Sequence, residues 1–384
     1  MIRRRVRTFL FWSHLVLGLT SGLVIGVVAL TGAVLAFEDE IVELAAPAPR
    51  PSRPAPAATP LKPEALIRRI TLEHPEDQIT RLRLSADPGR MHTAFLRQAG
   101  TLWLDPFTGA TQPPASSGLR AFFSFNLDLH RWLAAPREES AGSRFWNRTV
   151  GRGLVGWSTG ILVVLTVSGL FLWWPRTPGR RAFRLILRPQ KSFTGRLRHW
   201  NRHHVYGFWS AVPILAIGLT GLALAFPAVK GALYPAVDDT APAVPPPAST
   251  AAVVSVDVIF DRVVAAEPDW ASLLFYLPRQ NRDGSYVVRP LTIYAYTRSW
   301  PSTVANPLRF DPFTGDLLDY QPFYAKSFLS AAHALNRDVH TGAAFGWAGK
   351  AVTFAACVAT LVLIYTGFAL SFRRFKRRPS NQTS

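Results

Sequence analysis

The chain has 384 residues, of which 48% are hydrophobic and 12% aromatic, and it contains 31 prolines. This composition is too apolar for an ordinary soluble protein and predicts an integral membrane protein. The formal net charge of +19 is compatible with nucleic-acid binding, but its distribution argues against that class. Three segments without any acidic residue hold 18 of the 43 Lys and Arg residues. They indicate the positive-inside bias of a membrane protein, so the predicted partner is a lipid bilayer and not nucleic acid.

Four apolar spans, at about 9–37, 153–174, 204–226 and 346–372, are long enough to cross a bilayer. The basic segments lie before the first span, between the second and third, and after the fourth, which predicts two cytoplasmic termini. The predicted domains are 1–37 (basic start and first span), 38–152 (outer module), 153–174 (second span), 175–203 (basic cytoplasmic loop), 204–226 (third span), 227–345 (outer module), 346–372 (fourth span) and 373–384 (basic cytoplasmic tail).

The first span is repeated at the third. The stretch from His14 to Phe37, HLVLGLTSGLVIGVVALTGAVLAF, matches HHVYGFWSAVPILAIGLTGLALAF at 203–226, with His14 aligned to His203 and one Leu-Thr-Gly triplet aligned to the other. Small residues follow each histidine at four-residue spacing, so each imidazole heads a groove without side chains. Helix packing also uses small residues at this spacing. A histidine at the head of both grooves favours a flat ligand, with Gly18, Gly22 and Gly207 lining its site.

The two outer regions are also related to each other. Each opens with a proline-rich linker, at 46–60 and 241–250, and continues with a short amphipathic helix, LKPEALIRRITLEHP or VDVIFDRVVAAEP. Alternating segments that predict strands follow, and each set ends in the pentapeptide DPFTG, a turn signature, at 105–109 and 311–315. We therefore expect two small modules, each with a helix packed on a sheet.

A second repeated histidine follows each module. Asn126-Leu-Asp128-Leu-His130 corresponds to Asn336-Arg-Asp338-Val-His340. A continuous helix from His340 to the end of the fourth span would be about 50 Å long, so we expect a break near Gly342, Gly346 or Gly349. The topology places His130 and His340 near the outer face, whereas His14 and His203 lie near the cytoplasmic face.

Two histidine pairs at two depths suit two haem groups, each held by one imidazole from each half of the repeat. Six-coordinate haem is suited to electron transfer, because both axial positions of the iron are filled. Alternate ligands are His333, which shares a helical face with His340, and His204 and His199, which flank His203. His74 and His92 fall in an outer module, where we expect them to be solvated. Zinc is the competing metal, but no H-E-x-x-H motif completes a zinc site.

Other features limit the function classes. None of the four spans contains Asp or Glu, and this argues against an ion-coupled transporter. The chain lacks a G-x-G-x-x-G fingerprint, so its electrons must come from a partner. The sequence nominates no catalytic side chain beyond the proposed iron ligands. Cys357 lies in an apolar run, and we expect it to be packed or lipid-facing.

These residues together resemble the PepSY-associated transmembrane family, which includes bacterial inner-membrane ferric-siderophore reductases. The resemblance covers nearly the whole chain. It rests on the His-to-Leu-Thr-Gly spans, the DPFTG turns, Leu129-His130-Arg131-Trp132, the SGLFLWWPR stretch at 168–176, and His340-Thr-Gly with Phe345-Gly346-Trp347. It implies a mainly α membrane protein with four transmembrane helices in two pseudo-repeats and two periplasmic α+β PepSY-like modules.

The resemblance further implies b-type haem and reduction of iron carried by a siderophore in the periplasm. We therefore expect an enzyme, a ferric-siderophore or ferric-chelate reductase of the inner membrane that takes electrons from quinol or a cytoplasmic flavoprotein. Two alternatives stay open at this point. One is a non-catalytic PepSY membrane scaffold or peptidase-regulating module, and the other is an electron-transfer subunit that serves another protein.

Overall fold

A computed structural model describes residues 2–52, 58–114, 117–136, 146–235, 254–277 and 290–375. The chain divides into two compact units, which are described separately here. The membrane unit comprises Met1–Glu38, Arg120–Pro235 and Leu335–Ser384, and the sheet unit comprises Asp39–Leu119 and Ala236–Ala334. Residues 53–57 of the first predicted linker, the whole second linker and residues 376–384 of the basic tail lie outside the described residues.

Long apolar helices dominate the membrane unit. Three of them, α1 (Ile2–Leu35), α5 (Arg148–Trp173) and α12 (Gly346–Phe375), are long and apolar enough to cross a membrane. They correspond to the first, second and fourth predicted spans. A multi-pass membrane protein is the class that such helices indicate.

The third predicted span differs from a straight helix. It consists of α7 (Gly195–Trp209) and α8 (Ala211–Ala225), which pass the membrane-span test together but meet at a bend of 63°. Pro213 explains the break, because it has no N–H to donate to the Trp209 carbonyl and its ring clashes with that carbonyl. The helix therefore ends at Trp209 and restarts at Ala211.

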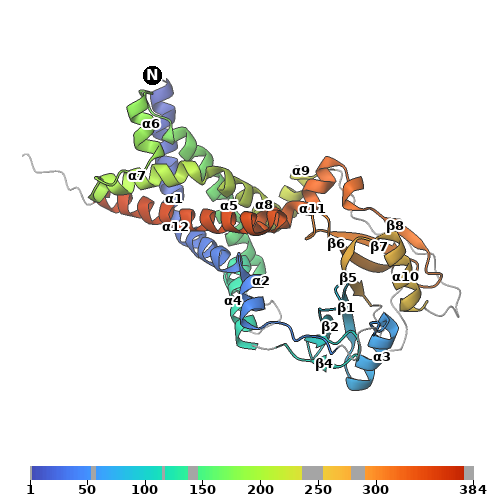
Figure 1. Cartoon of the computed structure of the whole chain (residues 1–384). Coiled ribbons are helices and arrows are strands. Elements are labelled where there is room, and N and C mark those ends of the chain that lie inside the picture. Colours follow the sequence, from blue (N-terminus) through green and yellow to red (C-terminus); the bar gives the residue numbers. More distant parts are fainter. Residues whose placement is uncertain are drawn as a thin grey trace, which may run out of the picture. The chain divides into compact units, whose positions relative to one another are not determined.

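The helices of the membrane unit pack as two related sets. Helix α1 contacts α5 and α12, while α7 packs against α12 and α8 packs against α5. Figure 1 shows α12 crossing α1 and running beside α7. The repeat found in the sequence is thus a repeat of packing, with α1 in one half and the α7–α8 pair in the other.

Shorter helices complete the connections. Helix α4 (Ser117–Trp132) precedes α5, and α11 (Phe328–Thr341) precedes α12. The predicted break after His340 is confirmed: Gly342 has a φ of 81°, and α12 begins at Gly346. Other short helices are α2 (Glu38–Ala45), α6 (Arg180–Leu187) and α9 (Pro227–Leu233).

The sheet unit joins the two predicted modules. The first contributes α3 (Pro63–Glu73), β1 (Ile79–Ser85), β2 (His92–Leu96), β3 (Thr101–Leu104) and β4 (Thr111–Gln112). The second contributes α10 (Val256–Ala266), β5 (Trp270–Tyr276), β6 (Leu291–Thr297), β7 (Ala305–Phe310) and β8 (Leu317–Tyr320). All eight strands form one antiparallel sheet in the order β4-β3-β2-β1-β5-β6-β7-β8. The halves meet where β1 pairs with β5, with Leu82 opposite Phe275.

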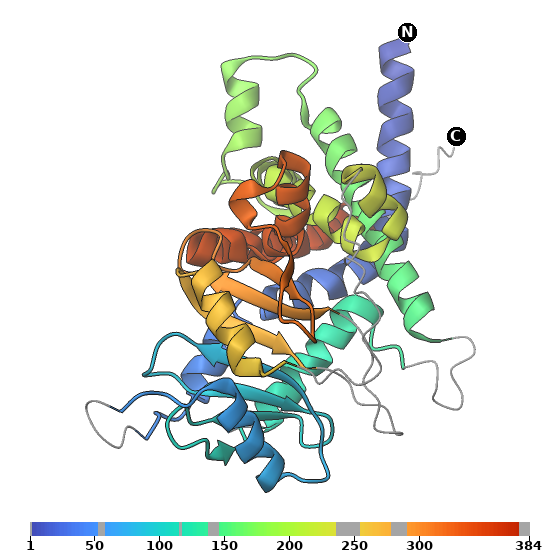
Figure 2. The same cartoon turned by 90° about the vertical axis from the view of Figure 1, so that its right-hand side faces the viewer.

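A shared core explains why the halves do not stay separate. Helices α3 and α10 lie on one face of the sheet (Figures 1 and 2) and bury Leu66 and Ile259 against the strands of both halves. The Lys62 ammonium also lies 2.8 Å from the Asp261 carboxylate across the two helices. A four-stranded half would expose β1 or β5 as an edge strand, whereas pairing them covers both edges.

Both DPFTG segments form the predicted turns. The side chain of Asp105 accepts hydrogen bonds from the Phe107 and Thr108 N–H groups at 2.8 and 3.1 Å. Asp311 accepts the equivalent pair, and Gly109 and Gly315 follow with φ values of 71° and 72°. The glycines are needed there because a side chain is strained at positive φ.

His92 contradicts the expectation of a solvated side chain, because it is only 5% exposed. It lies on β2, and its Nδ1 accepts a hydrogen bond of 3.1 Å from the Ser85 N–H. Burial lowers the pKa of His92 from its ordinary value to about 4, although the Asp105 carboxylate partly opposes this. His74, in contrast, is only half-buried.

The sheet unit should therefore lose stability in mild acid. Since the pKa of His92 is lower in the folded state, the unfolded chain alone takes up the proton between about pH 6.5 and pH 4, with a cost of up to about 3 kcal/mol. No such penalty exists above pH 6.5. Urea titrations at pH 7 and pH 4.5, followed by hydrogen exchange of β1–β3 peptides, measure this loss. His92→Asn keeps an acceptor for Ser85 and should flatten the pH dependence; an unchanged dependence would contradict the assignment.

Candidate functional site

The first histidine pair lies where α1 and α7 come together. His14 of α1 and His203 of α7 have ring centroids 6.4 Å apart, with ring planes inclined at 81°. They are the corresponding residues of the two repeat copies. The packing of each half against α5 and α12 brings the two rings close together in an edge-on arrangement.

The second pair comes from the two short helices that precede the second and fourth spans. His130 of α4 and His340 of α11 have ring centroids 6.3 Å apart, with planes inclined at 61°. All four imidazoles are half-buried. The structure thus brings together the same pairs that the repeat predicts, at nearly equal spacing.

This spacing is too long for direct hydrogen bonding and suits a shared metal ion. A nitrogen-to-nitrogen hydrogen bond of about 2.9 Å would bring the two centroids to about 5 Å. Two imidazoles that each lie about 2 Å from one metal ion have centroids about 6 Å apart. Both observed separations match the second arrangement.

A hydroxyl group orients each imidazole of the first pair. His14 Nδ1 lies 2.9 Å from Ser168 Oγ, and His203 Nδ1 lies 3.0 Å from Thr366 Oγ1. Each hydroxyl also donates to a carbonyl of its own helix, that of Leu165 or Val362. The hydroxyl oxygen therefore accepts from Nδ1–H, which leaves the lone pair of the imidazole on Nε2.

The second pair repeats this arrangement. His130 Nδ1 lies 3.0 Å from both Thr31 Oγ1 and the Val28 carbonyl. His340 Nδ1 lies 3.2 Å from Thr220 Oγ1 and 2.9 Å from the Ile217 carbonyl. Two acceptors at Nδ1 require a proton on that nitrogen. Ligating histidines in proteins are commonly held in this way, with the second nitrogen donating to the protein.

A glycine follows each of these four hydroxyl residues and leaves room for the ring. A Cβ atom at Gly32 or Gly221 would lie 3.2 or 3.0 Å from Cε1 of His130 or His340. At Gly169 and Gly367 it would lie 3.3 and 3.7 Å from Cε1 of His14 and His203. In the sequence, the Thr-Gly repeats served only to align the two copies. The presence of a Ser-Gly or Thr-Gly dipeptide in each of the four spans was the signal that these residues orient the histidines and make room for their rings.

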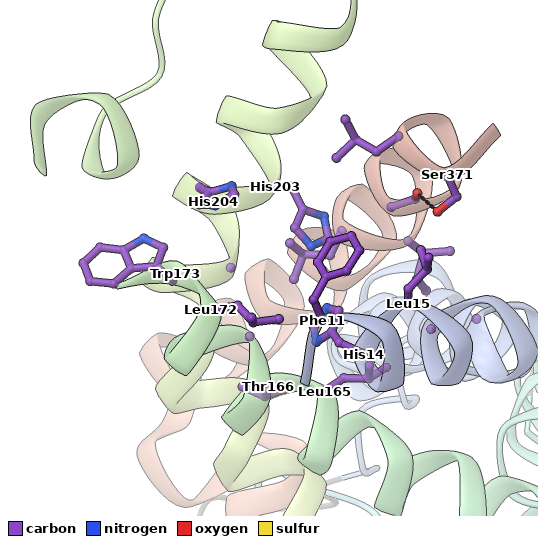
Figure 3. A pocket seen from close by; sticks show the side chains of 18 of the residues that line it. Phe11, His14, Leu15, Leu165, Thr166, Leu172, Trp173, His203, His204 and Ser371 are labelled. Carbon is purple, nitrogen blue, oxygen red and sulfur yellow. Dashed lines mark hydrogen bonds between the residues drawn. The ribbon is translucent and has the colours of Figure 1, made fainter. Parts of the chain in front are cut away.

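A cavity of about 1000 Å³ adjoins the first pair (Figure 3). His14 and His203 line it, as do Gly18, Gly22 and Gly207, the residues predicted to form the groove. Gly22 has a packing role as well, because a Cβ atom there would lie 2.9 Å from the Phe368 ring. The wall is otherwise largely apolar and aromatic.

Among the described residues that line the cavity, all the charged ones are basic. They are Arg7, Arg176 and Arg196, and none of the described lining residues is a carboxylate. Arg7 also donates to the Leu172 and Trp174 carbonyls at 2.6 and 3.0 Å, at the end of α5. The cavity therefore fits a flat apolar molecule that carries negative charge at its edge.

The alternate ligands occupy other positions. His204 lines the cavity, but its Nδ1 lies 2.9 Å from the Trp200 carbonyl. The ring of His199 packs against Tyr365, with centroids 5.5 Å apart. His333 lies two turns before His340, in the part of α11 that belongs to the sheet unit. Cys357 is buried and packs near Gly32, so it is a packed residue and not a lipid-facing one.

The described residues contain no group of three or more His, Cys, Asp and Glu side chains that is placed to hold a metal ion. The candidate donors are instead two separate histidine pairs, each oriented by hydroxyl groups. Two axial imidazoles are the protein ligands that a six-coordinate haem requires, because the macrocycle supplies the other four donors.

Comparison with known proteins supports the relationship indicated by the motifs. The family model described as the PepSY-associated TM region matches residues 11–374. A search of curated proteins gives no significant match. Because the family model covers almost the whole chain, including both histidine pairs and all eight strands, this protein belongs to the PepSY-associated transmembrane family.

Proposed function

We propose that the chain binds two haem b groups and passes electrons through the inner membrane to a periplasmic ferric siderophore. The observation that carries this proposal is the geometry of the two pairs. Both have a ring separation suited to one shared metal ion, and both have Nδ1 engaged by a hydroxyl group.

Three independent features suit the cofactor. The two imidazole pairs would hold haem through their Nε2 nitrogens, the glycines at the first pair leave a flat space, and the Arg7, Arg176 and Arg196 guanidiniums there suit anionic propionates. When bound by these residues, haem would supply reversible one-electron chemistry at its iron. The polypeptide positions the ligands, holds their Nδ1 protons and surrounds the site with apolar side chains.

The direction of transfer follows from the predicted topology. With the basic segments in the cytoplasm, His14 and His203 lie near the electron donor, while His130 and His340 lie near the periplasm. The donor is membrane quinol or a cytoplasmic flavoprotein. Each ferric siderophore accepts one electron, so its Fe(III) becomes Fe(II), which the siderophore holds less tightly. This makes the chain a ferric-chelate reductase with both termini in the cytoplasm.

The proposal predicts that the purified, anaerobically reduced protein is reoxidised by ferric siderophores. Each equivalent of oxidised haem should produce about one equivalent of Fe(II), trapped by a ferrous-specific chelator and followed with the haem spectrum. A matched protein without added chelate should stay reduced. Haem that stays reduced with every chelate would indicate an electron-transfer subunit. A protein that purifies without haem would favour the scaffold or peptidase-regulating role.

A further inference from the structure

Three arginines lie on the helices that carry or adjoin the second histidine pair. Arg131 follows His130 directly, and Arg337 lies one helical turn before His340. Both side chains are exposed, and both belong to the membrane unit. Arg148, at the start of α5, joins them from a third helix.

The pairing of the two histidines brings these cations together. The His130 and His340 ring centroids lie 6.3 Å apart, so the ends of α4 and α11 that carry Arg131 and Arg337 adjoin each other. The Asp128 carboxylate lies 3.3 Å from Arg148. Clustered like charges destabilise a fold unless an anion offsets them.

The two arginines of α5 have structural partners, whereas those of α4 and α11 lack a carboxylate partner among the described residues. Arg148 pairs with Asp128, and Arg152 donates to the carbonyls of Leu224 and Ala225. Among the described residues, neither Arg131 nor Arg337 forms an ion pair. The favourable interaction of a cation with a helix C-terminus accounts for Arg131 but not for the convergence of charges from three helices.

An aromatic ring holds part of the group in place. The guanidinium carbons of Arg131 and Arg148 lie 4.4 and 4.0 Å from the Trp132 ring centroid. Contacts of this kind restrict the planar guanidinium groups. The arginines are therefore partly arranged before any ligand arrives.

The backbone beside Trp132 is fixed in an unusual conformation. Leu133 and Ala134 have φ values of 50° and 55°, in the region that favours glycine. A Cβ atom at Gly151 would lie 2.1 Å from the Trp132 carbonyl oxygen, so α5 can approach this turn only because residue 151 is glycine. Strained backbone of this kind persists where the surrounding packing enforces it, and it is enriched at functional sites.

We propose that Arg131, held over the Trp132 ring, and Arg337, both beside the His130–His340 pair, bind anionic ferric chelates of the catecholate or carboxylate class. This assignment rests on the proposed function, which places the reducible iron at that pair. Guanidinium groups pair with carboxylate and catecholate oxygens and stack on aromatic rings. A neutral hydroxamate chelate offers them no comparable charge. The arginines thereby select among substrates by charge.

Binding of redox-inert gallium(III) complexes to the full-length protein in zwitterionic nanodiscs tests this selection. The two probes are a trianionic triscatecholate complex and a neutral trihydroxamate complex, measured by calorimetry. The double variant Arg131→Gln, Arg337→Gln should bind the trianionic complex at least about tenfold more weakly and the neutral complex within about twofold. Added salt should weaken only the trianionic complex.

Two further variants keep the test specific. Arg180→Gln with Arg181→Gln removes the same charge from exposed positions on α6 and should leave both affinities unchanged. Arg131→Lys with Arg337→Lys keeps the charge but loses the planar donors, so its affinity should be intermediate. Equal losses for both probes, or no loss for either, would overturn the proposal.

The gallium-binding result can be interpreted independently of the ferric-chelate reduction experiment. Gallium(III) is not reduced, so its binding is measured whether or not the protein reduces iron. Charge-selective gallium binding without reoxidation by any ferric chelate would reject only the reductase function. Loss of haem from the glutamine variant would instead assign these arginines to haem propionates and would overturn chelate binding.

Discussion

Replacing His203 with alanine should lower the haem content of the purified protein from about two groups per chain to about one. The ring centroids of His14 and His203 are 6.4 Å apart, so one imidazole cannot complete six-coordination without the other. His14→Ala should therefore remove the same haem, and the double variant should lose no more than either single variant. Pyridine haemochrome analysis and the low-temperature spectrum of the reduced protein measure the effect.

His204→Ala is the matched control for this prediction. It removes an imidazole from the same helix and cavity wall, at a residue whose Nδ1 lies 2.9 Å from the Trp200 carbonyl. We expect it to retain about two haem groups. If His204→Ala lost a haem while His203→Ala kept both, the ligand assignment at this pair would be wrong.

A glycine variant should remove the haem proposed at the His130–His340 pair without replacing either of these histidines. Gly221→Val places a Cβ atom 3.0 Å from Cε1 of His340, and the added methyl groups must displace the ring from its partner. Overpacking of this kind costs about 1–3 kcal/mol and disfavours the ring position that the proposed haem at this pair requires. We expect about one haem per chain, with the spectrum of the His14–His203 haem unchanged.

Gly153→Val is the corresponding control. Residue 153 lies on spanning helix α5, and outside that helix's own backbone no atom of the described residues lies within 4 Å of the Cβ position. This variant introduces the same side chain into an apolar helix and should retain about two haem groups. An equal loss in both variants would attribute the effect to general destabilisation of the membrane unit.

Some elements followed from local patterns in the chain. Length and hydrophobicity located α1, α5 and α12, because a span must satisfy its own backbone hydrogen bonds within one continuous helix. The bend within the third span was missed, although Pro213 carried its signal. The repeat nominated the histidine pairs, because two copies of one unit place corresponding residues at corresponding depths.

The role of the hydroxyl residues was not recognisable from local patterns. Ser168 and Thr366 are separated from their histidines by more than 150 residues, and their own helices give no sign of that contact. The spans alone do not reveal that each glycine beside a hydroxyl makes room for an imidazole. Only helix packing brings these groups within hydrogen-bond distance.

The sequence by itself determined the membrane class, the internal repeat, the four histidines and the turns at Asp105 and Asp311, since each depends on nearby residues or on direct self-similarity. Tertiary structure alone decided that β1 pairs with β5 in one sheet, that His92 is buried, and that the helix ends carrying Arg131 and Arg337 adjoin each other at the His130–His340 pair. Those outcomes depend on contacts between segments far apart in the chain. Their free energies come from burial, edge pairing and charge proximity, which no local periodicity encodes.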